Sequence, residues 1–125
     1  MTDRTSLGVG DFGRAIEFYT ACLRRLGYAP QRIKPDEAAF GTPESWDFFL
    51  YPVAPDKIVV GERNHVAFTA RGKDQIVDFH RAAVGNGAKS VRRPALRPDI
   101  GPDYFGTVLT DLDGHTLEAV FWDRG

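Results

Sequence analysis

The sequence contains a single cysteine, Cys22, so its 125 residues cannot form a disulfide within the chain. This fits a reducing compartment, and we expect a cytoplasmic location. No apolar run approaches the roughly 20 residues of a membrane-spanning helix, and MTDRTSLGVG lacks the basic and apolar regions of a signal peptide. The net charge is only −1, so we expect neither nucleic acid nor a membrane as a partner. Phosphate-loop, GxSxG and CxxC patterns are also absent.

Two segments have apolar residues at helical spacing, and the length suits one domain. The first follows Asp11, a typical N-cap residue, and ends before Gly27, where glycine commonly follows a helix. The second begins at Asp74 and ends near the glycines at 85–87. Each segment follows a strand-like stretch and precedes three more. The expected strands are 5–9, 29–33, 38–41 and 47–51, then 65–70, 89–93, 104–110 and 116–122.

This order is an internal repeat. Arg4 and His65 are 61 positions apart, and so are Ile16 and Val77 in the two helical segments. The equal spacing in strand and helix predicts an α+β fold of two βαβββ modules. We place the first module at about residues 3–55 and the second at about 62–123.

Strand alternation assigns side chains to the two faces of each predicted sheet. Arg4 and His65 fall on the faces away from the helices, and so does Glu118 in the last strand. Apolar residues surround Glu118 in the sequence, and an unpaired carboxylate in such a place is costly. Glu118 is therefore expected to have a partner or a function.

The paired modules and three motifs resemble the vicinal oxygen chelate superfamily. The motifs are LGVGDFGRAIEFY, NHVAF and DLDGHTLEAVFW, and the resemblance covers about residues 3–122. This group includes glyoxalase I, the bleomycin and fosfomycin resistance proteins, and the extradiol dioxygenases. The resemblance implies curved sheets that form a cup, with helices outside and a ligand or metal inside. It also implies a homodimer.

The resemblance further implies a divalent metal (Zn, Ni, Mn or Fe) held by the first and last strands of the modules. His65 and Glu118 match two ligand positions, and Glu118 is also the candidate catalytic residue. Arg4 stands where the family usually has histidine or glutamine, and Phe49 falls near the remaining position. A catalytic metal takes about three protein ligands. A cation ~4 Å from a divalent ion costs roughly 8 kcal/mol at an effective dielectric near 20.

Two functions remain open from the sequence. In the first, Arg4 lies in the cup and pairs with Glu118 or a bound anion. Phe49, Tyr51 and Trp122 then provide walls for a small anionic or aromatic molecule.

In the second function, His65 and Glu118 hold a metal in an enzyme similar to lactoylglutathione lyase or an extradiol dioxygenase. A third ligand would come from Asp3, Asp47 or the substrate. The charge of Arg4 favours the first function. His80, His115 and Cys22 are expected to be structural. Arg92, Arg93 and Arg97 are expected to form a solvated edge and loop, and the alternative is that they receive an anionic tail of the substrate.

Overall fold

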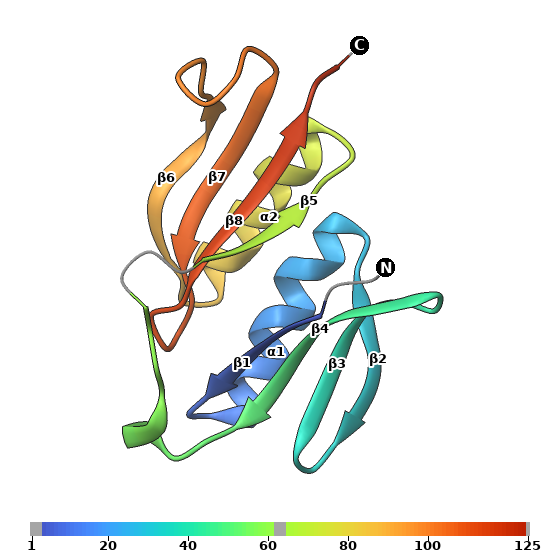
Figure 1. The fold of residues 1–125 in the computed structure, drawn as a ribbon, viewed down its shortest axis with the longest axis vertical. Helices are drawn as coiled ribbons and strands as arrows, with labels where there is room; N and C mark the ends of the chain where they lie inside the picture. The colour runs from blue at the N-terminus through green and yellow to red at the C-terminus, as the bar shows by residue number, and fades with distance from the viewer. Residues whose placement is uncertain (1–3, 62–64, 125) are drawn as a thin grey trace.

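The computed structural model describes residues 4–61 and 65–124 (Figure 1). The first half contains β1 (Thr5–Val9), α1 (Phe12–Leu23), β2 (Ala29–Lys34), β3 (Glu37–Thr42) and β4 (Ser45–Pro52). The second half contains β5 (His65–Thr69), α2 (Lys73–Gly85), β6 (Lys89–Leu96), β7 (Tyr104–Thr110) and β8 (Thr116–Trp122). Two short 3₁₀ turns, η1 (Arg24–Leu26) and η2 (Pro55–Lys57), follow α1 and β4. No helix in the described part of the chain is long and apolar enough to cross a membrane.

The two halves have the same topology. The strand order is β1-β4-β3-β2 in one sheet and β5-β8-β7-β6 in the other. In each sheet the first strand runs parallel to the last, and the remaining neighbours are antiparallel. The predicted α+β fold of two βαβββ modules is therefore confirmed, and the two sheets are not closed into one another.

The first helix has the predicted N-cap and the predicted glycine after its end, and the second begins within one residue of its predicted start. The Asp11 side chain accepts a hydrogen bond from the Arg14 amide at 3.1 Å and caps α1. Gly27 follows η1 with a φ of 89°, a left-handed conformation that glycine adopts without strain. The second helix begins at Lys73, one residue before the predicted start, and Asp74 lies in its first turn. A carboxylate there interacts favourably with the helix dipole.

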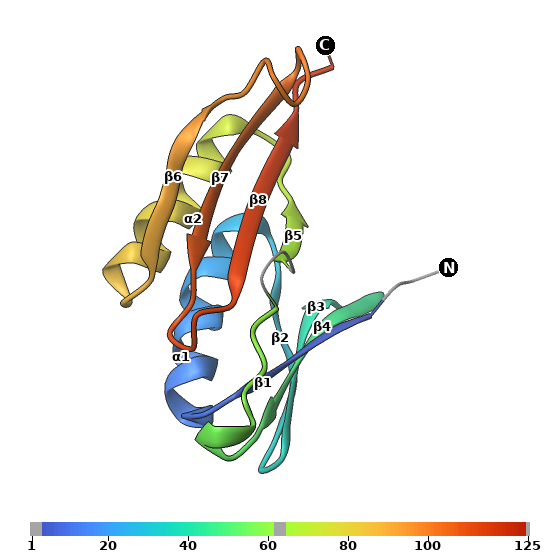
Figure 2. The same cartoon turned by 60° about the vertical axis from the view of Figure 1, so that its left-hand side comes forward.

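A single hydrophobic core joins the modules. The two helices pack against each other, and each covers one face of its own sheet (Figures 1 and 2). Phe48 of β4 and Phe68 of β5 meet edge to face, with ring centroids 5.3 Å apart. These two side chains lie on the faces that the helices cover. The other face of each sheet is open, so any site there is built by strand residues that point away from the helices.

The turn between β7 and β8 links the second module to the first. The buried Asp111 carboxylate accepts hydrogen bonds from the Tyr19 hydroxyl of α1 and from the amides of Asp113 and His115. The His115 imidazole donates from Nε2 to the Gly8 carbonyl at 2.8 Å. These bonds satisfy a carboxylate that would be costly to bury alone, and they fix the start of β8.

Replacing Tyr19 with Phe tests this link. The variant should lose about 1–3 kcal/mol of unfolding free energy, because a buried carboxylate loses a donor. Burial, and then the nearby Asp111 charge, raise the pKa of Tyr19 well above its usual value. The protonated hydroxyl therefore contributes stability below about pH 10, and this contribution is lost as the pH rises further.

Denaturant unfolding between about pH 8 and pH 11 measures both effects. The loss of stability at alkaline pH should be smaller in Tyr19→Phe than in the parent. Tyr51→Phe is the matched control, because its hydroxyl donates to Glu37 on the open face of the first sheet. Equal losses in the two variants would contradict the structural importance of the Tyr19–Asp111 bond.

Candidate functional site

The open face of the second sheet forms a hollow of about 720 Å³. Residues from β5, β6, β7 and β8 line it, together with the loop that precedes β7. This volume lies within the usual range for small-molecule sites. The charged and aromatic side chains of the lining are His65, Arg92, Arg93, Arg97, Tyr104 and Glu118.

Two side chains contact the Glu118 carboxylate on this face. His65 Nε2 lies 3.0 Å from Glu118 Oε1, and the Tyr104 hydroxyl donates to Glu118 Oε2. The strand registers produce this arrangement, because Ala67 lies opposite Glu118 in β5 and Val108 lies opposite it in β7. Residues at even spacing along a strand share a face, so His65, two residues from Ala67, and Tyr104, four residues from Val108, lie on the face of Glu118. The structure thus brings His65 and Glu118 together, with Tyr104 as a partner that the sequence analysis did not identify.

Gly106 makes room for the Tyr104 hydroxyl. A Cβ atom at Gly106 would lie 2.5 Å from Tyr104 Oη and 2.8 Å from the Ala119 carbonyl oxygen. Burial, and then the hydrogen bond to Glu118, raise the pKa of Tyr104 well above its usual value. The hydroxyl therefore stays protonated at neutral pH and remains a donor to the carboxylate.

Trp122 lies at the end of β8, beside the hollow. Its ring meets Tyr104 edge to face at a centroid distance of 5.3 Å. A Cβ atom at Gly101 would lie 3.1 Å from the Trp122 ring, so a glycine lets the loop approach the indole. The indole is 37% exposed and available for stacking.

Arg4 lies elsewhere, on the open face of the first sheet. Its guanidinium carbon is 4.2 Å from the centroid of the Phe49 ring, and Tyr51 stacks beside Phe49 at 6.4 Å. Arg4 does not pair with Glu118, which contacts His65 and Tyr104 instead, and the alternative pair between Arg4 and a bound anion stays a prediction. The reason is that β1 pairs with β4 and β5 with β8, which places the two residues on separate sheets.

The predicted ligand-binding residues therefore fall into two groups. Trp122 accompanies His65 and Glu118 on the second sheet, whereas Arg4 accompanies Phe49 and Tyr51 on the first. On the first sheet Glu37 already pairs with Arg32 at 2.8 Å and accepts from Tyr51 at 3.1 Å. Within the described ranges 4–61 and 65–124, no hydrogen bond or ion pair joins the two groups.

The His65–Glu118 pair fits two metal ligands but not a complete metal centre. Ligand atoms 3.0 Å apart can both contact one ion at typical bond lengths of about 2.0–2.2 Å. A catalytic metal takes about three protein ligands, and Phe49 of the first module has no donor atom. Asp47 lies in a different cavity, and Asp3 falls outside the described residues. Among the described residues, this face thus offers His65 and Glu118, one ligand fewer than a catalytic metal usually takes.

A second acidic group lies in the turn between β7 and β8. Ligand atoms of Asp111, Asp113 and His115 lie within 4.8 Å of one another, close enough to hold an ion. The sequence analysis missed this group, although the DLDGH pattern places two carboxylates around a glycine turn. The carboxylates accept hydrogen bonds from Tyr19 and backbone amides, including that of Gly10 at 3.2 Å. These hydrogen bonds stabilise the turn, which explains why the three side chains lie close together.

Known proteins share this architecture. The family model described as Glyoxalase/Bleomycin resistance protein/Dioxygenase superfamily matches residues 2–119. The chain belongs to this superfamily. No curated protein sequence matches the chain significantly.

Solved structures support the superfamily fold. A glyoxalase/bleomycin resistance protein from Albidiferax ferrireducens has a TM-score of 0.86 at 24% identity, over 97% of this chain and 98% of that chain. A genomically encoded fosfomycin resistance protein from Listeria monocytogenes has a TM-score of 0.71 at 15% identity, over 97% and 92% of the two chains. At these identities the similarity concerns the fold alone.

Replacing Gly106 with Ala tests how Tyr104 is positioned. The new methyl group should displace Tyr104 from Glu118 and lower the unfolding free energy by about 1–3 kcal/mol. Gly13→Ala is the matched control, because no atom lies within 4 Å of a Cβ placed there in α1. That change should leave stability equal or raise it, since alanine favours helices. Denaturant unfolding would contradict the assignment if the Gly106 variant were as stable as the parent.

Proposed function

We propose that this superfamily member binds a small anionic or aromatic molecule in the hollow of the second sheet, without a resident metal. The observation that supports this most directly is the state of Glu118. Its Oε2 accepts a hydrogen bond from the Tyr104 hydroxyl and its Oε1 lies 3.0 Å from His65 Nε2, within a hollow of about 720 Å³. A carboxylate satisfied in this way does not need a cation to remain stable.

The surroundings of Glu118 suit a planar molecule with an acidic group. Arg92 and Arg93 line the hollow from β6, and guanidinium groups bind carboxylates and phosphates through paired hydrogen bonds. Arg97 is less available, because it already pairs with Asp99. The proposed ligand therefore places its ring near Trp122 and its anionic group near the β6 arginines, away from Glu118.

Arg4, Phe49 and Tyr51 are proposed as a further anion-binding surface on the first sheet. The guanidinium lies over an aromatic ring and makes no ion pair with another described residue. Because the two sheets are not closed within the chain, this surface would reach the hollow only from a second copy. The homodimer is therefore part of the proposal.

We also propose a cytoplasmic location. Its support is the single cysteine, which is buried in α1. Burial raises the pKa of the Cys22 thiol, which keeps it protonated and unreactive at neutral pH.

A metal-dependent lyase or dioxygenase is the second candidate. The 3.0 Å separation of His65 Nε2 and Glu118 Oε1 favours it, because one Zn, Ni, Mn or Fe ion could contact both atoms. Such an ion would supply a Lewis acid for polarising substrate oxygens. In this candidate Glu118 is both ligand and catalytic residue, Tyr104 orients its carboxylate, and a substrate or a second copy supplies the missing ligand.

Ligand binding can be tested with small aromatic acids and their neutral alcohols. Thermal unfolding and tryptophan fluorescence should show stabilisation by acids such as benzoate or phenyl phosphate, and less by benzyl alcohol. Arg93→Gln should weaken acid binding by about tenfold, the loss of one charge-assisted contact. Arg81→Gln is the control, because this α2 arginine lies near Asp78 and outside the hollow. Equal affinities in the parent and both variants would exclude Arg93 as an acid-binding residue.

Metal analysis separates the two candidates. Protein purified without a metal-affinity tag should contain no stoichiometric divalent metal, and calorimetric titration of Zn²⁺, Ni²⁺, Mn²⁺ and Fe²⁺ should show only weak binding. Stoichiometric binding that His65→Ala abolishes would replace the metal-free proposal with the enzyme. Asp113→Asn is the control for binding at the β7–β8 turn.

A further inference from the structure

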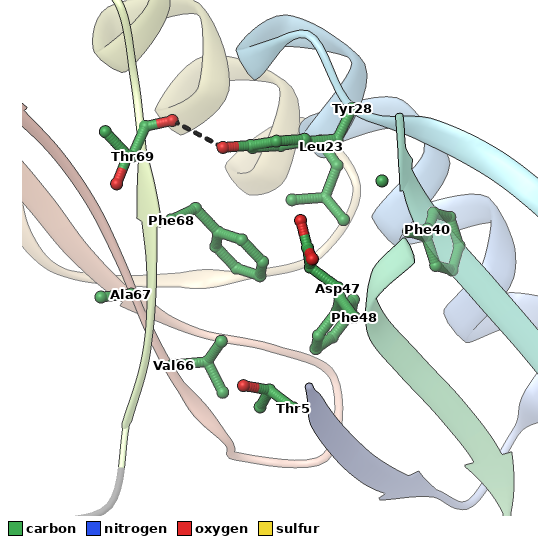
Figure 3. Close-up of a pocket in the computed structure, with 11 residues that line it drawn as sticks. Thr5, Leu23, Tyr28, Phe40, Asp47, Phe48, Val66, Ala67, Phe68 and Thr69 are labelled. Atoms are coloured by element: carbon green, nitrogen blue, oxygen red, sulfur yellow. Dashed lines mark hydrogen bonds between the residues drawn. The ribbon is translucent and has the colours of Figure 1, made fainter. Parts of the chain in front are cut away.

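A second cavity, of about 230 Å³, lies at the junction of the two modules (Figure 3). Its walls include three phenylalanines, Phe40, Phe48 and Phe68, and Leu23 of the first helix. All four side chains are at least nine-tenths buried. None of the residues that line this cavity also lines the hollow around Glu118.

One carboxylate points into this apolar space. Figure 3 shows the Asp47 side chain directed between Phe68 and Leu23, toward the ring of Tyr28. The Ser45 hydroxyl lies 2.5 Å from Asp47 Oδ1. In the described part of the chain Asp47 makes no ion pair. A carboxylate among aromatic rings with one hydroxyl partner still has acceptor capacity for a cation.

Tyr28 closes one side of the cavity. Its hydroxyl donates to the Thr69 carbonyl oxygen at 3.0 Å. This hydrogen bond links the residue before β2 to the last residue of β5. Burial, and then the charge of Asp47, raise the pKa of this phenol, whereas Arg71 acts in the opposite direction. The Asp47 carboxylate is thus close enough to act electrostatically on the Tyr28 hydroxyl across the cavity.

We propose that this cavity is a second binding site, which takes a small organic cation: a primary ammonium on a short aromatic or aliphatic body. The Asp47 carboxylate pairs with the ammonium, and the faces of Phe68 and Tyr28 add cation–π attraction. The body of the ligand fills the space between Phe40, Phe48 and Leu23. Neither an anion nor a strongly hydrated inorganic ion suits these walls, because both lose more hydration than the site returns.

The first test compares two molecules of similar shape and opposite charge. Protonated 2-phenylethylamine and 3-phenylpropionate are titrated into isotopically labelled protein, and backbone amide NMR shifts are recorded. The amine should perturb the amides of residues 46–48 and 66–69 and saturate, whereas the acid should not perturb them. No saturable shift with the amine, or equal shifts with both molecules, would overturn the proposal.

The second test removes the charge and keeps the shape. Asp47→Asn retains an oxygen for the Ser45 hydroxyl, and it should weaken amine binding by at least about tenfold. Asp56→Asn, in η2, is the matched control and should bind the amine as the parent does. His65→Ala should also leave amine binding unchanged, because His65 belongs to the other site. Parent-like affinity in Asp47→Asn would overturn the assignment of the carboxylate, as would loss of binding in the control.

Discussion

The buried Asp111 carboxylate fixes the arrangement on which both sites depend. It accepts the Tyr19 hydroxyl from the first module and two amides of its own turn. The turn sets where β8 begins, and the register of β8 aims Glu118 at Tyr104 and His65. The same link docks the modules together and so defines the cavity at their junction. A buried carboxylate without these donors would cost several kcal/mol, so the turn can adopt few other arrangements.

Glu118, on the open face of the second sheet, is also a carboxylate that needs polar partners. In this chain two side chains satisfy it, and a metal is not needed for that purpose. The first strand of the first module has Arg4 at the position of a metal ligand. The Arg4 guanidinium lies over Phe49 rather than beside Glu118. The metal-free binding proposal thus depends on the contacts of Glu118 with His65 and Tyr104 within the second module. The proposal does not depend on electrostatic repulsion between Arg4 and a metal ion, which was the argument from the sequence.

The elements could be predicted from the sequence because helical and strand periodicities are local, and the repeat fixed their order. Strand alternation likewise placed His65 and Glu118 on one face, since each module is a single sheet. The contacts between modules could not be predicted in this way. The Tyr19–Asp111 bond joins residues 92 positions apart, and the separation of Arg4 from Glu118 depends on how the two sheets pack. No local pattern distinguishes the structural Asp111 from the carboxylate of Asp47, which points into a cavity.

The protonation state of His65 Nε2 shows whether the protein carries a metal beside Glu118. Long-range ¹H–¹⁵N NMR of the imidazoles can be recorded on protein purified without a metal-affinity tag, before and after dialysis against a chelator. We expect His65 Nε2, 3.0 Å from Glu118 Oε1, to carry a proton and no metal, and its signal to be the same in both samples. An unprotonated, metal-bound Nε2 whose signal changes on chelation would show that the protein has a resident metal.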